Sequence, residues 1–136
     1  MSDSLKDGLE RLGGETGIAH WMELFYDRVA QNPILKPIFP GDLSESRKKQ
    51  TAYMIEFLGG PKRYTEAYGK PFLRFKHRHF RIGVQERDAW MEAFLGSMRE
   101  VTEDAGLIAE MEAAVGAIAT AMVNHHPEKK DAYYFN

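Results

Sequence analysis

The strongest constraint on the fold of this chain is the recurrence of apolar side chains at intervals of three and four residues. One such stripe runs from Ile18 to Val29, and another runs from Ile108 to Met122. This spacing places apolar side chains on one face of an α-helix. No stretch of useful length alternates apolar and polar residues, as a half-buried strand would. The sequence therefore predicts an all-α fold.

Glycine and proline mark where the helices should end. Such breaks occur at residues 13–14, 32–33, 59–61 and 106. Asp42 is expected to cap the helix that follows it, with Glu45 three residues later. The predicted long helices cover residues 15–31, 42–58, 85–104 and 107–125. Shorter helical turns are expected at 3–12, at 63–68 and around His77, whose element should end at 82–83.

Length, charge and composition narrow the class of protein. A chain of 136 residues is expected to form one domain over 1–136, with a core from about 13 to 125 and a tail at 127–136. Cysteine is absent, so any metal must be held by His, Asp, Glu or Met. A net charge of −2 argues against nucleic-acid and membrane-surface binding. With no apolar signal core and no apolar run near the roughly 20 residues of a membrane span, the sequence predicts a soluble cytoplasmic protein.

The segment 72–80 contains two histidines among apolar and basic residues. Imidazole is a common iron ligand, and haem iron typically has one proximal histidine, so His77 is a candidate ligand. Neighbouring side chains offer apolar surface for a porphyrin (Phe72, Leu73, Phe80) and cations for its propionates (Arg74, Lys76, Arg78). The same pattern also fits a surface helix with a solvated histidine, and these residues alone leave both interpretations open.

The helix expected at 42–58 has an unusual face. Five residues share one side of it, at relative positions 0, 4, 7, 8 and 11: Ser46, Gln50, Tyr53, Met54 and Phe57. Two polar side chains therefore begin a stripe that should face inward. Ser46 and Gln50 fit equally well at a helix edge that faces water.

Six motifs in order along the chain resemble those of truncated haemoglobins of the second group. They are Phe25-Tyr26, Pro37-Ile38-Phe39-Pro40, Leu58-Gly59-Gly60-Pro61, Leu73-Arg74-Phe75-Lys76-His77, Asp88-Ala89-Trp90 and Met122-Val123-Asn124. The resemblance extends from about residue 13 to 124. It implies a truncated globin fold, in which a two-over-two helical sandwich encloses haem b.

The resemblance also implies roles for individual residues. His77 matches the proximal iron ligand, and Tyr26 and Trp90 match distal residues whose O–H and N–H groups point toward a bound ligand. Ser46 and Gln50 occupy the two distal-helix positions that face the ligand, where no histidine is present. Taken singly, Tyr26 and Trp90 also fit ordinary core residues. Further cofactor contacts are expected from Phe39, Lys49, Met54, Tyr64, Phe72, Leu73, Lys76, Phe80, Ile82, Trp90 and Met122, with Lys49, Tyr64 and Lys76 near the propionates.

These roles imply a protein that binds dioxygen and other diatomic gases tightly, because a phenol, an indole and an amide can all donate hydrogen bonds to a partly negative oxygen. Oxidation of nitric oxide or slow peroxide reduction, supported by an unidentified reductase, is compatible with this pocket. A haem-based gas or redox sensor acting through a separate partner is the alternative, and a cofactor-free helical interaction domain is a third. The chain is expected to be a monomer or homodimer. Of the other histidines, His79, His125 and His126 are expected to be solvated, and His20 has no visible partner.

Overall fold

The computed structural model describes residue 5 and residues 7–125, and all structural statements below refer to these residues. Their elements in chain order are α1 (Gly8–Arg11), α2 (Gly14–Gln31), a 3-10 turn η2 (Lys36–Ile38), α3 (Ser44–Phe57), α4 (Arg63–Tyr68), α5 (Leu73–Lys76), α6 (Val84–Val101) and α7 (Ala105–Ala121). The described part of the chain contains no β-strand. The predicted all-α class is confirmed.

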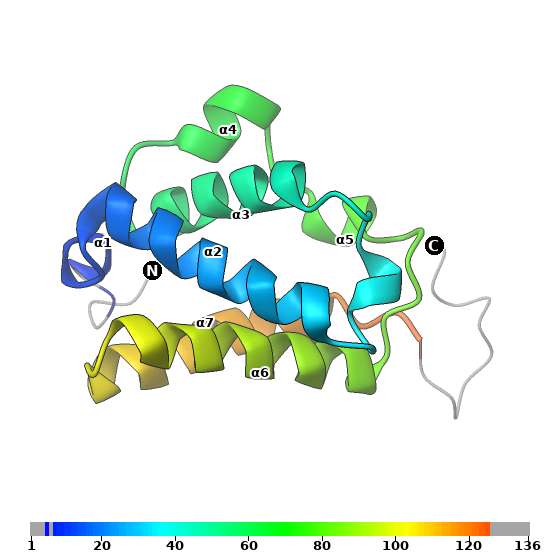
Figure 1. The fold of residues 1–136 in the computed structure, drawn as a ribbon. Coiled ribbons are helices and arrows are strands. Elements are labelled where there is room, and N and C mark those ends of the chain that lie inside the picture. Colours follow the sequence, from blue (N-terminus) through cyan, green and yellow to red (C-terminus); the bar gives the residue numbers. More distant parts are fainter. Residues whose placement is uncertain (1–4, 6, 126–136) are drawn as a thin grey trace.

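The long helices form two layers. Figure 1 shows α2 and α3 crossing above α6 and α7, with the short helices α4 and α5 at the periphery. Helix α2 packs on both α3 and α6, and α6 packs on α7. This arrangement is the predicted two-over-two helical sandwich.

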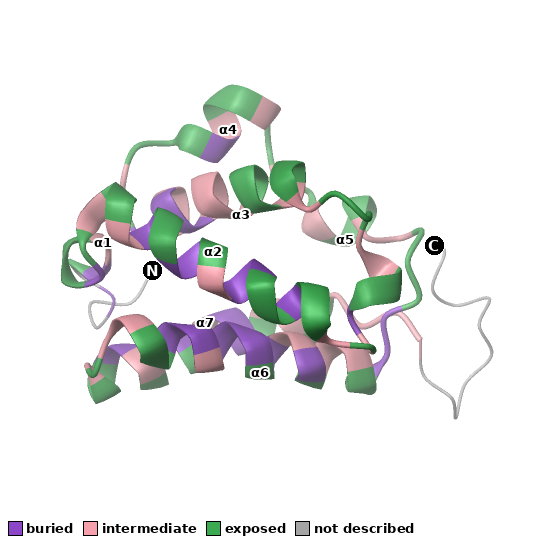
Figure 2. Cartoon of the chain, in the orientation of Figure 1, coloured by how far each residue is buried: buried purple, intermediate pink, exposed green. Residues whose placement is uncertain are grey.

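The core lies between the two layers, on the faces that the apolar spacing predicted. Ile18, Met22, Phe25 and Val29 of α2 are completely buried, and Figure 2 shows the buried residues on the inward sides of α2, α6 and α7. Burial of one large apolar side chain contributes about 1.5–3 kcal/mol to stability. The packing of these stripes, more than helix propensity, therefore holds the helices in place.

The core also contains one buried polar side chain among the described residues, Ser97 of α6. Its hydroxyl donates to the Phe94 carbonyl at 2.9 Å and accepts from the indole N–H of Trp21 at 3.0 Å. Because both polar groups find partners, burying them carries little penalty. This pair explains why a serine lies on an otherwise apolar stripe.

Several helix boundaries differ from those expected. Helix α3 begins at Ser44, after Leu43. Leu43 is its N-cap residue, and the Asp42 carboxylate, one position earlier, accepts hydrogen bonds from the backbone amide and the hydroxyl of Ser44, the first helical residue. Gly106 does not break the chain, since it lies in the first turn of α7, where the Asp104 side chain accepts from the Leu107 amide at 3.0 Å. The break falls at residues 102–104, where Thr102 is extended.

The segment around His77 is less helical than expected. Helix α5 ends at Lys76, His77 follows as its C-terminal cap, and no helix continues to residue 82. Helix α7 ends at Ala121 instead of near residue 125. Both helices end early for the same reason, because the residues that follow them form hydrogen bonds with each other. The backbone amide of Asn124 donates to the Ile82 carbonyl at 2.8 Å.

None of the described helices combines the length and the apolar character that crossing a bilayer requires. The expected tail at 127–136 and His126 lie outside the described residues.

Candidate functional site

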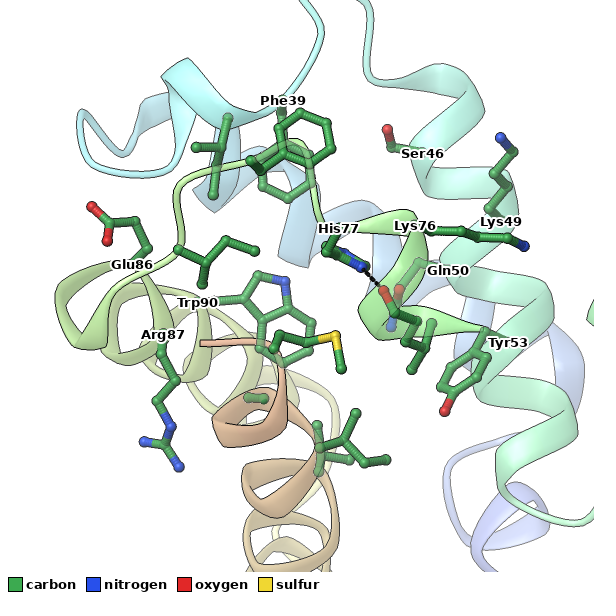
Figure 3. Close-up of a pocket in the computed structure, with 18 of the residues that line it drawn as sticks. Phe39, Ser46, Lys49, Gln50, Tyr53, Lys76, His77, Glu86, Arg87 and Trp90 are labelled. Atoms are coloured by element: carbon green, nitrogen blue, oxygen red, sulfur yellow. Dashed lines mark hydrogen bonds between the residues drawn. The ribbon is translucent and has the colours of Figure 1, made fainter. Parts of the chain in front are cut away.

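A cavity of about 540 Å³ lies between the two helix layers at the end where α5 packs. Its volume is within the range of small-molecule and cofactor pockets, roughly 300–1,000 Å³. Figure 3 shows side chains from the corner before α3 and from α3, α5 and α6 converging on it. The predicted site residues that line it are Tyr26, Phe39, Ser46, Lys49, Gln50, Met54, Tyr64, Leu73, Lys76, His77, Phe80, Ile82, Trp90 and Met122.

His77 enters this cavity with its ring held by the end of α5. Its Nδ1 lies 2.6 Å from the backbone carbonyl oxygen of Leu73, one turn earlier (Figure 3). A carbonyl can only accept, so Nδ1 carries the proton and donates it. In the neutral ring the other nitrogen, Nε2, then has a lone pair available to a metal. The helix end therefore fixes the tautomer that an iron ligand needs.

Tyr26 presents a buried hydroxyl to the cavity. The side chain is 7% exposed, and its ring packs edge-on against Phe25 and Phe39, with centroids 4.8 and 5.9 Å away. Within residues 7–125 its hydroxyl makes no hydrogen bond. Burial raises the pKa of Tyr26 far above its usual value, so the phenol stays protonated. It is a donor without an acceptor among the described residues.

The two tryptophans of the chain differ in whether the indole N–H has an acceptor among the described residues. Trp21 donates its indole N–H to the Ser97 hydroxyl, at 3.0 Å in the core. Trp90 stacks on Phe94, with centroids 4.9 Å apart, and packs edge-on against Phe25. It lines the cavity, and in the part of the chain that the structure describes its N–H has no acceptor. A buried or half-buried indole usually finds a partner, so Trp90 is the exception.

Gln50 and Ser46 complete the polar lining on the α3 side. Both side chains are half-buried and line the cavity. Neither side chain forms a hydrogen bond with another described residue. Together with Tyr26 and Trp90 they leave several donors facing one space.

One edge of the cavity, between α3 and α5, is cationic. The Lys76 ammonium donates to the Tyr64 hydroxyl at 2.9 Å and lies 5.1 Å from the centroid of that ring. The Lys49 ammonium lies 5.5 Å from the centroid of the Tyr68 ring. Lys49 and Lys76 therefore approach the cavity rim from two different helices, as a carboxylate-bearing ligand would require.

Comparison with known proteins places this geometry in a family. The family model described as bacterial-like globin matches residues 9–124. The chain is 40% identical over 111 residues to the group 2 truncated haemoglobin YjbI of Bacillus subtilis, covering 82% of this chain and 80% of that protein.

The chain belongs to the bacterial-like globin family.

Solved truncated globins share its fold. The truncated oxygen-avid haemoglobin from Bacillus subtilis superposes with a TM-score of 0.81 at 37% identity, covering 85% of this chain and 98% of that one. The group II truncated haemoglobin from Bacillus anthracis has a TM-score of 0.82 at 34% identity, covering 85% and 94%. The resemblance to truncated haemoglobins and the truncated globin fold are thus confirmed, and membership of this family implies haem binding and diatomic gases as ligands.

The residues present in the cavity fit haem. One imidazole has a free lone pair, apolar side chains from α3, α5 and α7 flank it, and two ammonium groups lie at the rim. The Tyr26 hydroxyl is a buried polar atom that lacks a partner within the described chain. A bound ligand would satisfy it.

The structure does not support the sequence-based assignment of Phe72 as a cofactor contact. Its side chain is 64% exposed and does not line the cavity. It is the residue before α5, with a positive φ of 44°. This backbone conformation turns the chain into the short helix, so the side chain leaves the face that Leu73 and His77 share.

The basic residues near His77 differ in whether they line the cavity. Only Lys76 lines the cavity, whereas Arg78 lies over the Phe75 ring, 3.6 Å from its centroid, and donates to the Phe75 carbonyl at 2.7 Å. Arg74 is exposed and does not line the cavity. Because neither Arg74 nor Arg78 lines the cavity, the structure does not support the expectation that they meet the propionates.

The remaining histidines are placed as follows. His20 and His79 are exposed, and for His79 this was expected. His125 is half-buried, and its Nε2 lies 2.6 Å from an Arg81 guanidinium nitrogen. It is less solvated than expected, because the chain after α7 folds back on the segment after His77.

Several cavity residues had received no role from the sequence. They are Ile38, Pro40, Tyr53, Tyr68, Glu86, Arg87, Val115, Ile118 and Ala119. Tyr53, Val115 and Ile118 already lay on stripes expected to face inward, so periodicity gave a signal for them. Glu86 and Arg87 lie one turn before Trp90 and share its side of α6, which is a weaker signal.

Proposed function

We propose that this globin holds haem b through His77 and binds dioxygen and other diatomic ligands tightly in the space lined by Tyr26, Trp90, Gln50 and Ser46. The observation that carries the proposal is that an imidazole of fixed tautomer and unpartnered donors line one cavity. A purely structural role would leave these donors without a purpose, because protein cores normally satisfy such groups.

The cofactor would be held by three kinds of contact. His77 Nε2 would bind the iron, and the Leu73 carbonyl would keep that ring in place through Nδ1. Lys49, Lys76 and Tyr64 would meet the propionates at the rim. Apolar contacts would come from Phe39, Met54, Leu73, Phe80, Ile82 and Met122.

Haem iron supplies reversible binding of diatomic gases and shifts negative charge onto them. The residues of this chain act on that charge. The Tyr26 hydroxyl, the Trp90 N–H and the Gln50 amide donate hydrogen bonds, and the aromatic packing around Tyr26 and Trp90 keeps water away. Three net hydrogen bonds of about 1 kcal/mol each would slow ligand escape by roughly 100-fold.

Tight holding favours ligand capture or chemistry on bound dioxygen over oxygen delivery. One of the neighbouring structures, the haemoglobin from Bacillus subtilis, is described as oxygen-avid, which agrees with this proposal. No histidine lies at the Ser46 and Gln50 positions, so the acid–base chemistry of peroxidases is disfavoured relative to oxidation of nitric oxide. Stopped-flow kinetics with dioxygen, nitric oxide and peroxide on one preparation would separate these reactions.

The experiment that tests the proposal is an absorbance spectrum of the purified protein and of two histidine variants. Wild type should show the strong haem band near ~400 nm. His77→Ala should lose this band and recover it only when imidazole is added. His79→Ala is the matched control, because His79 lies two residues away but is exposed, and it should keep the band. An unchanged spectrum in His77→Ala would refute the ligand assignment.

A further inference from the structure

The side chain of Asn124, just after α7, forms hydrogen bonds to the segment that begins at His77. Its Oδ1 accepts from the Ile82 amide at 2.8 Å. Its Nδ2 donates to the Phe80 carbonyl at 2.7 Å and to the His77 carbonyl at 3.3 Å. One side-chain amide thus bonds to three backbone groups of residues 77–82, a segment without regular secondary structure, and the His77 carbonyl also accepts from the Phe80 amide at 3.0 Å.

These bonds act on the residue that carries the imidazole. His77 is anchored at its ring by the Leu73 carbonyl and at its own carbonyl by Asn124. The first anchor belongs to α5, a helix of only four residues, which cannot be rigid by itself. The second anchor belongs to the chain just after α7, a helix of 17 residues packed on α6. The stiff part of the fold therefore reaches His77 through Asn124.

The backbone amides at this junction repeat the contact. The Asn124 and His125 amides donate to the Ile82 carbonyl at 2.8 and 3.0 Å. These two bonds do not need the Asn124 side chain, so after a substitution at Asn124 the two segments would stay side by side. What the side chain adds is the link to the Phe80 and His77 carbonyls, closer to the imidazole.

We infer that Asn124 is a positioning residue for the His77 imidazole, setting how firmly that ring is presented to iron. The inference rests on the proposed function, since it takes His77 as the iron ligand. Without the Asn124 side chain, the segment 77–82 would keep the backbone hydrogen bonds at the Ile82 carbonyl. It would lose the hydrogen bonds from the Asn124 Nδ2 to the Phe80 and His77 carbonyls. The imidazole would then sample more orientations, and the bond to iron would weaken.

Two substitutions separate this role from a general structural one. Asn124→Ala removes all three side-chain hydrogen bonds. Asn124→Asp keeps an acceptor for the Ile82 amide but places a carboxylate oxygen opposite the Phe80 and His77 carbonyls, where it cannot donate. If positioning depends on donation to these carbonyls, Asp should be no better than Ala. If Asn124 only satisfies the Ile82 amide, Asp should restore wild-type behaviour.

Asn32 provides the matched control. Its side chain accepts from the Ile34 and Leu35 amides, at 2.8 and 3.2 Å, and it does not line the cavity. Asn32→Ala therefore removes side-chain-to-backbone bonds from another corner of the same fold. It should lower stability without changing the environment of His77.

The experiment uses the haem-loaded protein and three readouts. These are the iron–imidazole stretching band in the resonance Raman spectrum, the rate of haem transfer to an excess of apomyoglobin, and hydrogen exchange of the peptide covering 77–82. Asn124→Ala and Asn124→Asp should each shift or broaden the band, release haem about 10- to 100-fold faster and exchange faster at 77–82. Asn32→Ala should match wild type in all three.

Wild-type values for the band and for haem release in both Asn124 variants would overturn the inference, as would rescue by Asp alone. These outcomes differ from failure of the proposed function. If His77→Ala keeps the haem band, the ligand assignment is wrong and the inference falls with it. If His77→Ala loses the band while both Asn124 variants behave as wild type, only the inference is wrong.

Discussion

Replacing Tyr26 with phenylalanine should change ligand release and protein stability in different ways. The substitution removes one oxygen atom and leaves the ring, which is held between Phe25 and Phe39 at centroid distances of 4.8 and 5.9 Å. The packing of the aromatic cluster should therefore survive. Only the hydroxyl is lost, and it has no partner among the residues that the structure describes.

The magnitude follows from what the hydroxyl donates to. A hydrogen bond contributes about 1 kcal/mol when neutral and about 1.5–3 kcal/mol when one partner is charged. A diatomic ligand with partial negative charge lies between these cases, so its dissociation should become roughly 5- to 100-fold faster. The free energy of unfolding of the haem-free protein should stay equal or rise by about 1 kcal/mol, because Tyr26→Phe breaks no protein hydrogen bond and removes a buried polar group.

Dioxygen dissociation is measured by stopped-flow displacement with carbon monoxide, and stability by urea denaturation of the haem-free protein. An unchanged dissociation rate would show that Tyr26 does not donate to the ligand. A loss of stability comparable to that of a core truncation would show instead that the hydroxyl has a structural role. Either result would refute the assignment of Tyr26 as an unpartnered distal donor.

Other substitutions test the remaining donors and one charged contact. Trp90→Phe should also speed dioxygen dissociation by about 5- to 100-fold, whereas Trp21→Phe, which loses a core hydrogen bond, should lower the unfolding free energy by about 1 kcal/mol with little change in dissociation; the opposite pattern would contradict the contrast between them. Gln50→Leu should have a smaller effect on dissociation than Tyr26→Phe, because a glutamine side chain is held less rigidly, and a larger effect would reverse this order. Hydrogen bonds from the Thr65 hydroxyl and amide lower the pKa of Glu56 below its usual 4.5. The stabilising contribution of Glu56 should therefore be complete above pH 4.5 and be lost as the pH falls through the lowered pKa. Glu56→Gln should flatten this part of the stability curve in urea denaturation from about pH 6 to 3, and an unchanged pH dependence would contradict it.

Much of the fold could be read from local pattern. The apolar stripe of α2 was expected from residues 18–29, and Ile18, Met22, Phe25 and Val29 are indeed fully buried. Helix ends were predicted less well. Gly106 was taken as a break but lies within α7, because the Asp104 side chain supplies the cap that starts the helix before it. Capping depends on side-chain geometry that residue type alone does not determine.

The candidate site was predicted in part. The side chains that line the cavity include nearly all those expected from the resemblance, but Phe72 points into solvent and of the nearby cations only Lys76 approaches the rim. A four-residue helix has too few turns for its periodicity to be read from sequence. Whether these residues perform their proposed roles stays a prediction.

The sequence by itself determined which faces are apolar and that a short helical turn lies near His77, because both depend on neighbours a few positions apart. Only the tertiary structure decided which polar groups are satisfied. Trp21 finds Ser97 across 76 positions and Asn124 reaches Ile82 across 42, whereas Trp90 and Tyr26 find no acceptor within the described chain. Hydrogen-bond satisfaction depends on contacts between distant segments, and those contacts exist only after the helices have packed.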